Sequence, residues 1–465
     1  MKLLYSLIPL VLLTVFACEA DRDAAPDRQS EAPGMQENVA FMNLNPGHFH
    51  AGLIHLNHYP QVDSTVYVYA PEGEELNSYL NMIRQFNQRD ENPTRWEAEV
   101  YTGEDYLQRM LEEQPGNVMV VAGNNARKIE YVSRAVDNGI HVLSDKPMII
   151  APDQFPLLQN ALESADRQGI VLNDMMTERH EITNILMREL SQIPELFGEQ
   201  RQGSPEEPAI KKESVHFFYK TVAGETLIRP AWFFDVKQQG EAIVDVSTHL
   251  VDQVLWKAFP DDAVDFRNPD DGVDVVHAEI WHTDLSDDQF TLITGTEAFP
   301  AYLMDDVEDN ILKVASNGSF VFEVRGVYAK VSAQWGFTNP DGGDTHYSVM
   351  RGTRADLVIR QDLEQDFVAT LYVVPADEAD EDFERVLQEA LGSLGDTYEG
   401  LSARHTEFGW EISIPEAYVE THEEHFTRVT QRFLEALEIG RIPEWERVNL
   451  ETKYFLTTRA YEKSR

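Results

Sequence analysis

A regular alternation of short apolar runs with amphipathic segments between residues 39 and 143 constrains the fold most strongly. The apolar runs have the length of buried strands, and the segments between them carry apolar residues at helical spacing. Strands that alternate with helices predict a parallel, doubly wound sheet. Gly139 is placed to end the last helix in a left-handed C-cap. The expected strands are residues 39–44, 64–69, 98–101, 118–122 and 141–143, and the expected helices are residues 48–56, 75–86, 104–113 and 126–138.

The second half of the chain has a different pattern. Its segments alternate or favour β-branched and aromatic residues, and turn signals such as Asn317-Gly318 separate them. This predicts an α/β domain with a large, mainly antiparallel open sheet. Helical spacing returns at residues 384–394 and 422–437. The expected strands are residues 275–282, 289–294, 311–315, 319–324, 327–335, 355–359 and 370–374.

Length and charge set the broad class. A chain of 465 residues exceeds the usual size of one domain. We therefore predict two domains, at residues 39–172 and 173–465. The 38 basic and 81 acidic residues give a formal net charge of -43, which argues against nucleic-acid binding because that needs clustered Lys and Arg. The acids are spread along the chain and predict a solvated acidic shell.

The N-terminus has the pattern of an export signal. Lys2 precedes a short apolar stretch, and Ala17 precedes Cys18, the only cysteine of the chain. Residues 15–18 resemble a bacterial lipobox, which implies removal of residues 1–17 and a lipid on Cys18. Residues 18–38 are polar and read as a flexible tether. We expect an exported periplasmic or outer-membrane lipoprotein that touches the membrane through this lipid alone; the alternative is an ordinary signal peptide with an incidental cysteine.

Two motifs resemble one enzyme family. Residues 139–148 end in Asp145-Lys146-Pro147-Met148, and residues 240–252 contain Asp245 and His249 after a leading glycine. Their order and spacing are similar to those of the glucose–fructose oxidoreductase and inositol dehydrogenase family (Gfo/Idh/MocA). The tail resembles that of a subgroup of exported oxidoreductases with a C-terminal extension. The resemblance implies a Rossmann domain followed by an α/β domain with an open antiparallel sheet, through which homo-oligomers can form.

The resemblance also implies NAD or NADP as cofactor. A nucleotide-binding turn usually has three glycines, but the matching residues here are Asn45, Gly47 and His50. We expect Gly47 to let the backbone approach the pyrophosphate, with His48 and His50 as added donors. Asn125 matches the family's asparagine after the fourth strand. The altered turn leaves open a Rossmann scaffold that no longer binds a dinucleotide.

Oxidation of a secondary alcohol needs a hydride acceptor and a base. His249 suits the proton transfer, and Asp245, four residues earlier, is expected on the same helix face, where it would orient the imidazole. By resemblance, Lys146 contacts both the substrate hydroxyl and the cofactor. The structural alternative is a surface lysine and an ordinary helical pair.

The expected substrate is a sugar or glycoside. Arg229, Trp232 and Asp235 are candidates to line its pocket, since an aromatic ring surrounded by polar groups suits a sugar; the alternative is that Trp232 is core. No metal-binding set is predicted, and His422 and His425 are expected to be solvated. We therefore predict an NAD(P)-dependent sugar oxidoreductase. The alternatives are an NAD-dependent glycoside hydrolase that acts by oxidation and elimination, and a redox-inactive sugar-binding lipoprotein.

Overall fold

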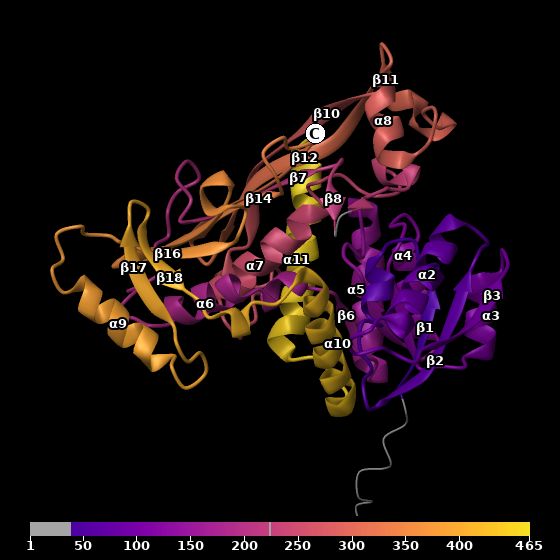
Figure 1. The fold of residues 1–465 in the computed structure, drawn as a ribbon, viewed down its shortest axis with the longest axis horizontal. Coiled ribbons are helices and arrows are strands. Elements are labelled where there is room, and N and C mark those ends of the chain that lie inside the picture. Colours follow the sequence, from indigo (N-terminus) through magenta and orange to yellow (C-terminus); the bar gives the residue numbers. More distant parts are fainter. Residues whose placement is uncertain (1–38, 223–224) are drawn as a thin grey trace, which may run out of the picture. The chain divides into compact units, whose positions relative to one another are not determined.

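The computed structural model describes residues 39–222 and 225–465, which belong to one compact unit (Figure 1). The predicted signal segment, Cys18 and the tether lie outside the described residues. Two sheets dominate this unit, and they follow one another along the chain. Among the described residues, no helix is both long enough and apolar enough to cross a membrane.

The first sheet is parallel throughout and has the order β3-β2-β1-β4-β5-β6. Buried side chains of α2 and α10 pack on one face, and those of α3, α4, α5 and α11 pack on the other. The predicted doubly wound sheet is confirmed. Its strands are β1 (Val39–Leu44), β2 (Val62–Ala70), β3 (Glu97–Thr102), β4 (Val118–Val121), β5 (His141–Ser144) and β6 (Leu172–Asp174). Its helices are α1 (His50–Leu53), α2 (Glu74–Gln88), α3 (Tyr106–Glu113), α4 (Lys128–Asp137) and α5 (Phe155–Gln168).

The second sheet has the order β10-β12-β13-β7-β14-β15-β16-β18-β17, and β11 pairs with β12. All of its pairs are antiparallel except that of β13 with β7, so the predicted mainly antiparallel sheet is confirmed. Its strands are β7 (Ile210–Phe217), β10 (Asp274–Ser286), β11 (Val307–Glu308), β12 (Ile311–Val324), β13 (Val327–Gly336), β14 (Thr345–Arg351), β15 (Ala355–Gln361), β16 (Thr370–Pro375), β17 (Ser402–Thr406) and β18 (Gly409–Ser413). A separate hairpin joins β8 (Thr221–Val222) to β9 (Glu225–Thr226).

Six helices accompany the second half of the chain. Helices α6, α7 and α9 pack on the second sheet. The strand β6 continues to Asp174, so the first sheet extends two residues past the boundary predicted at residue 172. These helices are α6 (Ile182–Ser191), α7 (Val246–Ala258), α8 (Asp287–Thr294), α9 (Phe383–Ser393), α10 (His422–Ile439) and α11 (Glu444–Lys463).

Three local predictions were wrong. Residues 289–294, predicted as a strand, lie in α8, which begins with a capping box between Ser286 and Gln289. Asn317-Gly318, predicted as a turn, lies inside β12. The Asn317 side chain bonds to both neighbouring strands, and a Cβ on Gly318 would come within 3.2 Å of Ile243. This glycine marks a close approach of another segment. The helix predicted at residues 48–56 is reduced to the four residues of α1.

The last helix, α11, joins the two halves of the unit, and it lies between them as the yellow helix of Figure 1. It contributes Tyr454 to the core of the first sheet and Leu456 to that of the second. The Lys453 Nζ lies 2.9 Å from an oxygen of Asp174 at the end of β6 and 3.0 Å from Asp252 on α7. All three side chains are buried, so this ion pair network connects the two sheets.

Candidate active site

The turn after β1 keeps a nucleotide-turn conformation without the usual first glycine. Asn45 stands at that position with a φ of 47°, in the left-handed region that asparagine tolerates better than most residues. The turn lies between β1 and β4, where the strand order reverses and where ligands of such sheets bind. A Cβ built on Gly47 would be 3.5 Å from Gly123 and 3.7 Å from the Trp232 ring. The protein therefore leaves ordinary space beside Gly47.

The backbone amides of this turn are partly used by the protein itself. The amides of Gly47 and His48 both donate to the Ala122 carbonyl at the end of β4, at 3.0 and 3.2 Å. The adjacent Gly123 is packed so closely that a Cβ there would lie 2.7 Å from the Asn45 carbonyl oxygen. The turn is thus fixed to β4, and fewer amides remain for an anion than in a free helix N-terminus.

Other expected cofactor residues bond within the protein. The Asn125 side chain donates to the Gln239 carbonyl at 2.7 Å, and its amide donates to the Gln238 carbonyl at 2.9 Å. Asn125 therefore fastens the first sheet to the segment that precedes α7. The predicted phosphate donors His48 and His50 direct ring nitrogens toward Asp145, with Nδ1–Oδ2 distances of 3.8 and 3.0 Å.

Lys146 and Asp245 meet where the two halves of the unit join. Lys146 follows β5, and its Nζ lies 2.8 Å from Asp245 Oδ1. The Gln239 side chain donates to the other Asp245 oxygen at 2.9 Å. Burial alone lowers the pKa of Lys146, but the Asp245 and Asp145 carboxylates outweigh it and hold that pKa above its usual value. Lys146 is therefore a cation at neutral pH.

The structure corrects the expected pairing of Asp245 with His249. Asp245 is the residue before the first turn of α7, so it does not lie on the same helix face as His249. Its oxygens bond to Lys146 and Gln239, whereas His249 Nδ1 is buried without a hydrogen-bond partner among the described residues. Burial, helped by the Lys146 charge, lowers the pKa of His249 to about 3. The imidazole is therefore neutral at pH 7 and has a free ring nitrogen.

The three expected substrate residues have different surroundings. The Arg229 guanidinium is buried, donates to the carbonyls of Phe217 and Phe218, and lies over aromatic rings. The Asp235 carboxylate accepts hydrogen bonds from the Lys237 backbone amide and from the Gln238 side chain. Both side chains thus hold their own segment in place. Trp232 lies beside Gly47, and its Nε1 donates to Glu75 at 3.1 Å. Substrate contact by these residues stays a prediction.

Sequence reasoning missed a group of charged residues near His249. Glu178 follows β6, Lys212 lies on β7 and His346 lies on β14. Burial raises the pKa of Glu178, but His249, His346, Lys212 and His422 together lower it to about 2. These residues come from separate elements that are far apart in the sequence. No motif could have revealed them. His425, expected to be solvated, is instead buried on α10.

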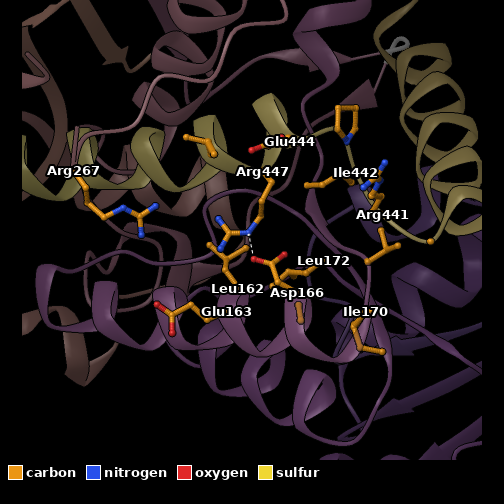
Figure 2. Close-up of a pocket in the computed structure, with 16 residues that line it drawn as sticks. Leu162, Glu163, Asp166, Ile170, Leu172, Arg267, Arg441, Ile442, Glu444 and Arg447 are labelled. Carbon is orange, nitrogen blue, oxygen red and sulfur yellow. Dashed lines mark hydrogen bonds and ion pairs between the residues drawn. The ribbon is translucent and has the colours of Figure 1, made fainter. Parts of the chain in front are cut away.

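A separate hollow of about 630 Å³ lies between α5 and the start of α11 (Figure 2). Arg447 and Asp166 on its wall form an ion pair at 3.1 Å, marked by the dashed line in Figure 2. Arg267 likewise bonds to Asp265 and Glu451. None of the candidate catalytic residues lines this hollow.

A Rossmann-type sheet joined to a large mixed sheet, with a lysine–aspartate pair across the junction, defines an α/β protein of the oxidoreductase class. A family model described as "Putative oxidoreductase C terminal domain" matches residues 186–465. The chain belongs to this oxidoreductase family. No curated protein matches the sequence.

Solved structures resemble the chain over most of its length. An oxidoreductase from Parabacteroides merdae, itself of "putative" activity, is 48% identical with a TM-score of 0.89, covering 92% of this chain and 98% of that chain. GenD2 from gentamicin A biosynthesis, in complex with NAD, is 14% identical with a TM-score of 0.57, covering 93% and 96%. KijD10, a 3-ketoreductase from Actinomadura kijaniata in complex with NADP and TDP-benzene, is 14% identical with a TM-score of 0.52, covering 89% and 94%. The last two likenesses establish the fold alone.

Proposed function

We propose that the protein is an NAD(P)-dependent oxidoreductase that acts on a secondary hydroxyl, or the corresponding ketone, of a sugar or glycoside. One observation carries the proposal: a cationic Lys146 follows β5 of the first sheet, and a neutral His249 with a free ring nitrogen lies on α7, close enough for the Lys146 charge to add to burial in lowering its pKa. Alcohol oxidation needs a base for the hydroxyl proton, and a nearby cation stabilises the charge that develops on the oxygen.

The charge states of Lys146 and His249 determine their different roles. Lys146 stays protonated beside Asp245, so it stabilises negative charge on the substrate oxygen by donating a hydrogen bond. It is a poor base for the same reason. His249 is neutral and can take the hydroxyl proton or return it. Asp245 acts through Lys146, since its oxygens contact Lys146 and Gln239 rather than His249. Asp245 is therefore a positioning residue.

The residues of the turn fit a dinucleotide. Gly47 leaves the space that a side chain would fill, and Asn45 keeps the left-handed conformation of the missing glycine. Asn45, Gly47 and Lys146 would hold the cofactor, with Trp232 beside the turn. When bound, a nicotinamide dinucleotide supplies the hydride acceptor or donor. The complexes of GenD2 with NAD and of KijD10 with NADP support this choice of cofactor.

We also propose where the protein is located in the cell and how it assembles. The lipobox-like residues 15–18 support an exported lipoprotein anchored through Cys18, and the open second sheet supports a homo-oligomer. KijD10 is a 3-ketoreductase whose structure contains TDP-benzene, and this supports a carbohydrate-type substrate for the present protein.

The test is a calorimetric titration of nucleotide-free protein with NAD and NADP, followed by absorbance at about 340 nm with a panel of sugars and keto sugars. We expect saturable binding of one nucleotide and turnover of at least one sugar. For the site variants His249→Ala and Lys146→Ala, the matched controls are His282→Ala and Lys330→Ala. His282 is an exposed histidine of β10, and Lys330 lies on β13. No nucleotide binding by folded protein would exclude the oxidoreductase function.

One observation favours a second candidate, a redox-inactive sugar-binding lipoprotein. Two amides that could meet a pyrophosphate already bond to the Ala122 carbonyl. A protein of this kind would bind sugars in the calorimeter but give no heat with NAD or NADP.

A further inference from the structure

We propose that His48, His50 and Asp145 form a binding site for one divalent transition-metal ion, with zinc as the representative ion. His48 and His50 follow β1, and Asp145 follows β5, which is separated from β1 in the sheet by β4 alone. One ligand atom from each of the three residues lies within 4.8 Å of the other two. No other group of three such residues with this spacing occurs among residues 39–222 and 225–465.

The distances suit a tetrahedral ion. Zinc bonds of about 2.0–2.1 Å to nitrogen and oxygen place two ligand atoms about 3.4 Å apart at a tetrahedral centre. The Asp145 Oδ2 lies 3.0 Å from His50 Nδ1 and 3.8 Å from His48 Nδ1, on either side of that value. Both distances to the carboxylate are thus within about half an ångström of the value for a tetrahedral ion.

The ligand types select the metal. Two imidazoles and one carboxylate are the set that catalytic zinc sites use, and they leave one coordination position open for water or substrate. Imidazole nitrogen disfavours calcium and magnesium, which prefer oxygen ligands. This preference matters because a chain with a net charge of -43 attracts such ions weakly over its whole surface.

The surroundings hold the carboxylate in place. The Asp145 amide donates to the Val121 carbonyl at 2.8 Å, and the Lys128 Nζ donates to the Asp145 carbonyl at 3.0 Å. These bonds use the main chain and leave the Asp145 carboxylate to the two histidines. The His50 side chain is only 11% exposed and packs against Phe426.

The neighbouring cations are compensated. Lys146 is paired with Asp245 at 2.8 Å, which offsets its repulsion of a metal ion. The Lys128 Nζ bonds to the Asp145 carbonyl oxygen and not to its carboxylate. The His422 ring of α10 lies 5.7 Å from the His50 ring, measured between the ring centres. The local charge balance therefore permits a divalent cation.

The test uses the whole protein after chelator treatment, without nucleotide. Titration with Zn²⁺ in a large excess of Ca²⁺ is expected to give one tight site. Substitution by Co²⁺ should give the intense visible bands of a tetrahedral ion. His50→Ala and Asp145→Asn should each weaken zinc binding more than a hundredfold, since even the loss of an outer partner costs tenfold to a hundredfold. His405→Ala, an exposed histidine of β17, should bind as the wild type does.

Circular dichroism of each variant shows whether it is folded, and Asp145→Asn is the second variant should His50→Ala fail to fold. Absence of a saturable zinc site in the wild type overturns the proposal. So does unchanged binding in a folded His50→Ala or Asp145→Asn protein, which would mean that zinc binds elsewhere on the acidic surface. Because no nucleotide or sugar enters this experiment, its failure leaves the oxidoreductase proposal standing.

Discussion

Replacing Lys453 by methionine should destabilise the protein strongly, because the substitution leaves a buried carboxylate without a cation. Asp252 keeps Arg179, whose guanidinium donates to both its oxygens at 2.6 and 2.7 Å. Asp174 keeps only the Tyr454 hydroxyl, at 2.9 Å. The uncompensated charge therefore falls on Asp174. Removing one partner of a buried pair costs about 3–5 kcal/mol.

The expected shift in melting temperature follows from the size of the unit. An unfolding entropy of about 2.1 cal/mol/K per residue gives about 0.9 kcal/mol/K for roughly 430 residues. The loss then corresponds to a melting temperature about 3–6 °C lower, measured by calorimetry near neutral pH. The matched control is Lys463→Met on the same helix, whose Nζ lies 3.9 Å from Asp274 and is partly exposed. It should cost less than about 1 kcal/mol.

The loss should also depend on pH. Burial already raises the pKa of Asp174, and removing the Lys453 charge, which lowers that pKa, raises it further. A group whose pKa is higher in the folded state stabilises the protein at low pH, and this contribution is lost as the pH rises through that value. The gap between wild type and variant should therefore shrink as the pH is lowered from neutral, by at most about 1.4 kcal/mol per pH unit. A gap that stays constant or widens on acidification, or one no larger than that of Lys463→Met, would refute this reasoning.

The remaining predictions concern the site and the anchor. His249→Ala should lower turnover by about a hundredfold to ten-thousandfold with a smaller change in KM, while Lys146→Ala should impair both turnover and binding; near-normal kcat in both variants contradicts the assigned roles. Gly47→Val should fold, because a Cβ meets only ordinary contacts there, yet lose nucleotide affinity in titration, whereas Gly123→Ala should lower the melting temperature through its 2.7 Å approach to the Asn45 carbonyl. Cys18→Ser should move the protein from the membrane fraction to the soluble fraction on immunoblots; unchanged fractionation excludes the lipid anchor.

The first sheet was predictable because its central strands β1, β4 and β5 are buried on both sides. Residues 118–121 carry only valine and methionine, so the local pattern states the environment directly. The helix α11 was missed for the opposite reason. Residues 449–454 of this helix are buried on every side, including the polar Asn449, Glu451 and Lys453. A helix whose polar residues are satisfied by distant partners has no apolar stripe, and periodicity cannot show it.

The candidate site shows a similar limit. Lys146, Asp245 and His249 were found because they belong to two short motifs, and the structure places Lys146 against Asp245. The partner of Asp245 could not be predicted, since helix spacing suggested His249 and the helix begins one residue too late. In the His48–His50–Asp145 group, His50 and Asp145 are 95 positions apart in the sequence. They meet because β1 and β5 lie on either side of β4 in the first sheet, which the sequence around each residue does not show.

The position of α11 has a consequence for the order in which the chain can fold. The Met148 amide, next to the Lys146 turn, donates to the Tyr454 hydroxyl of α11. Lys453 of the same helix forms the ion pair with the Asp174 carboxylate. During synthesis from the N-terminus, the first sheet therefore emerges long before the helix that completes its outer layer. Until α11 has been made, the first sheet lacks the counter-ion of Asp174 and the helix that covers part of its apolar face. The native packing around Met148 and Asp174 is therefore completed late in synthesis.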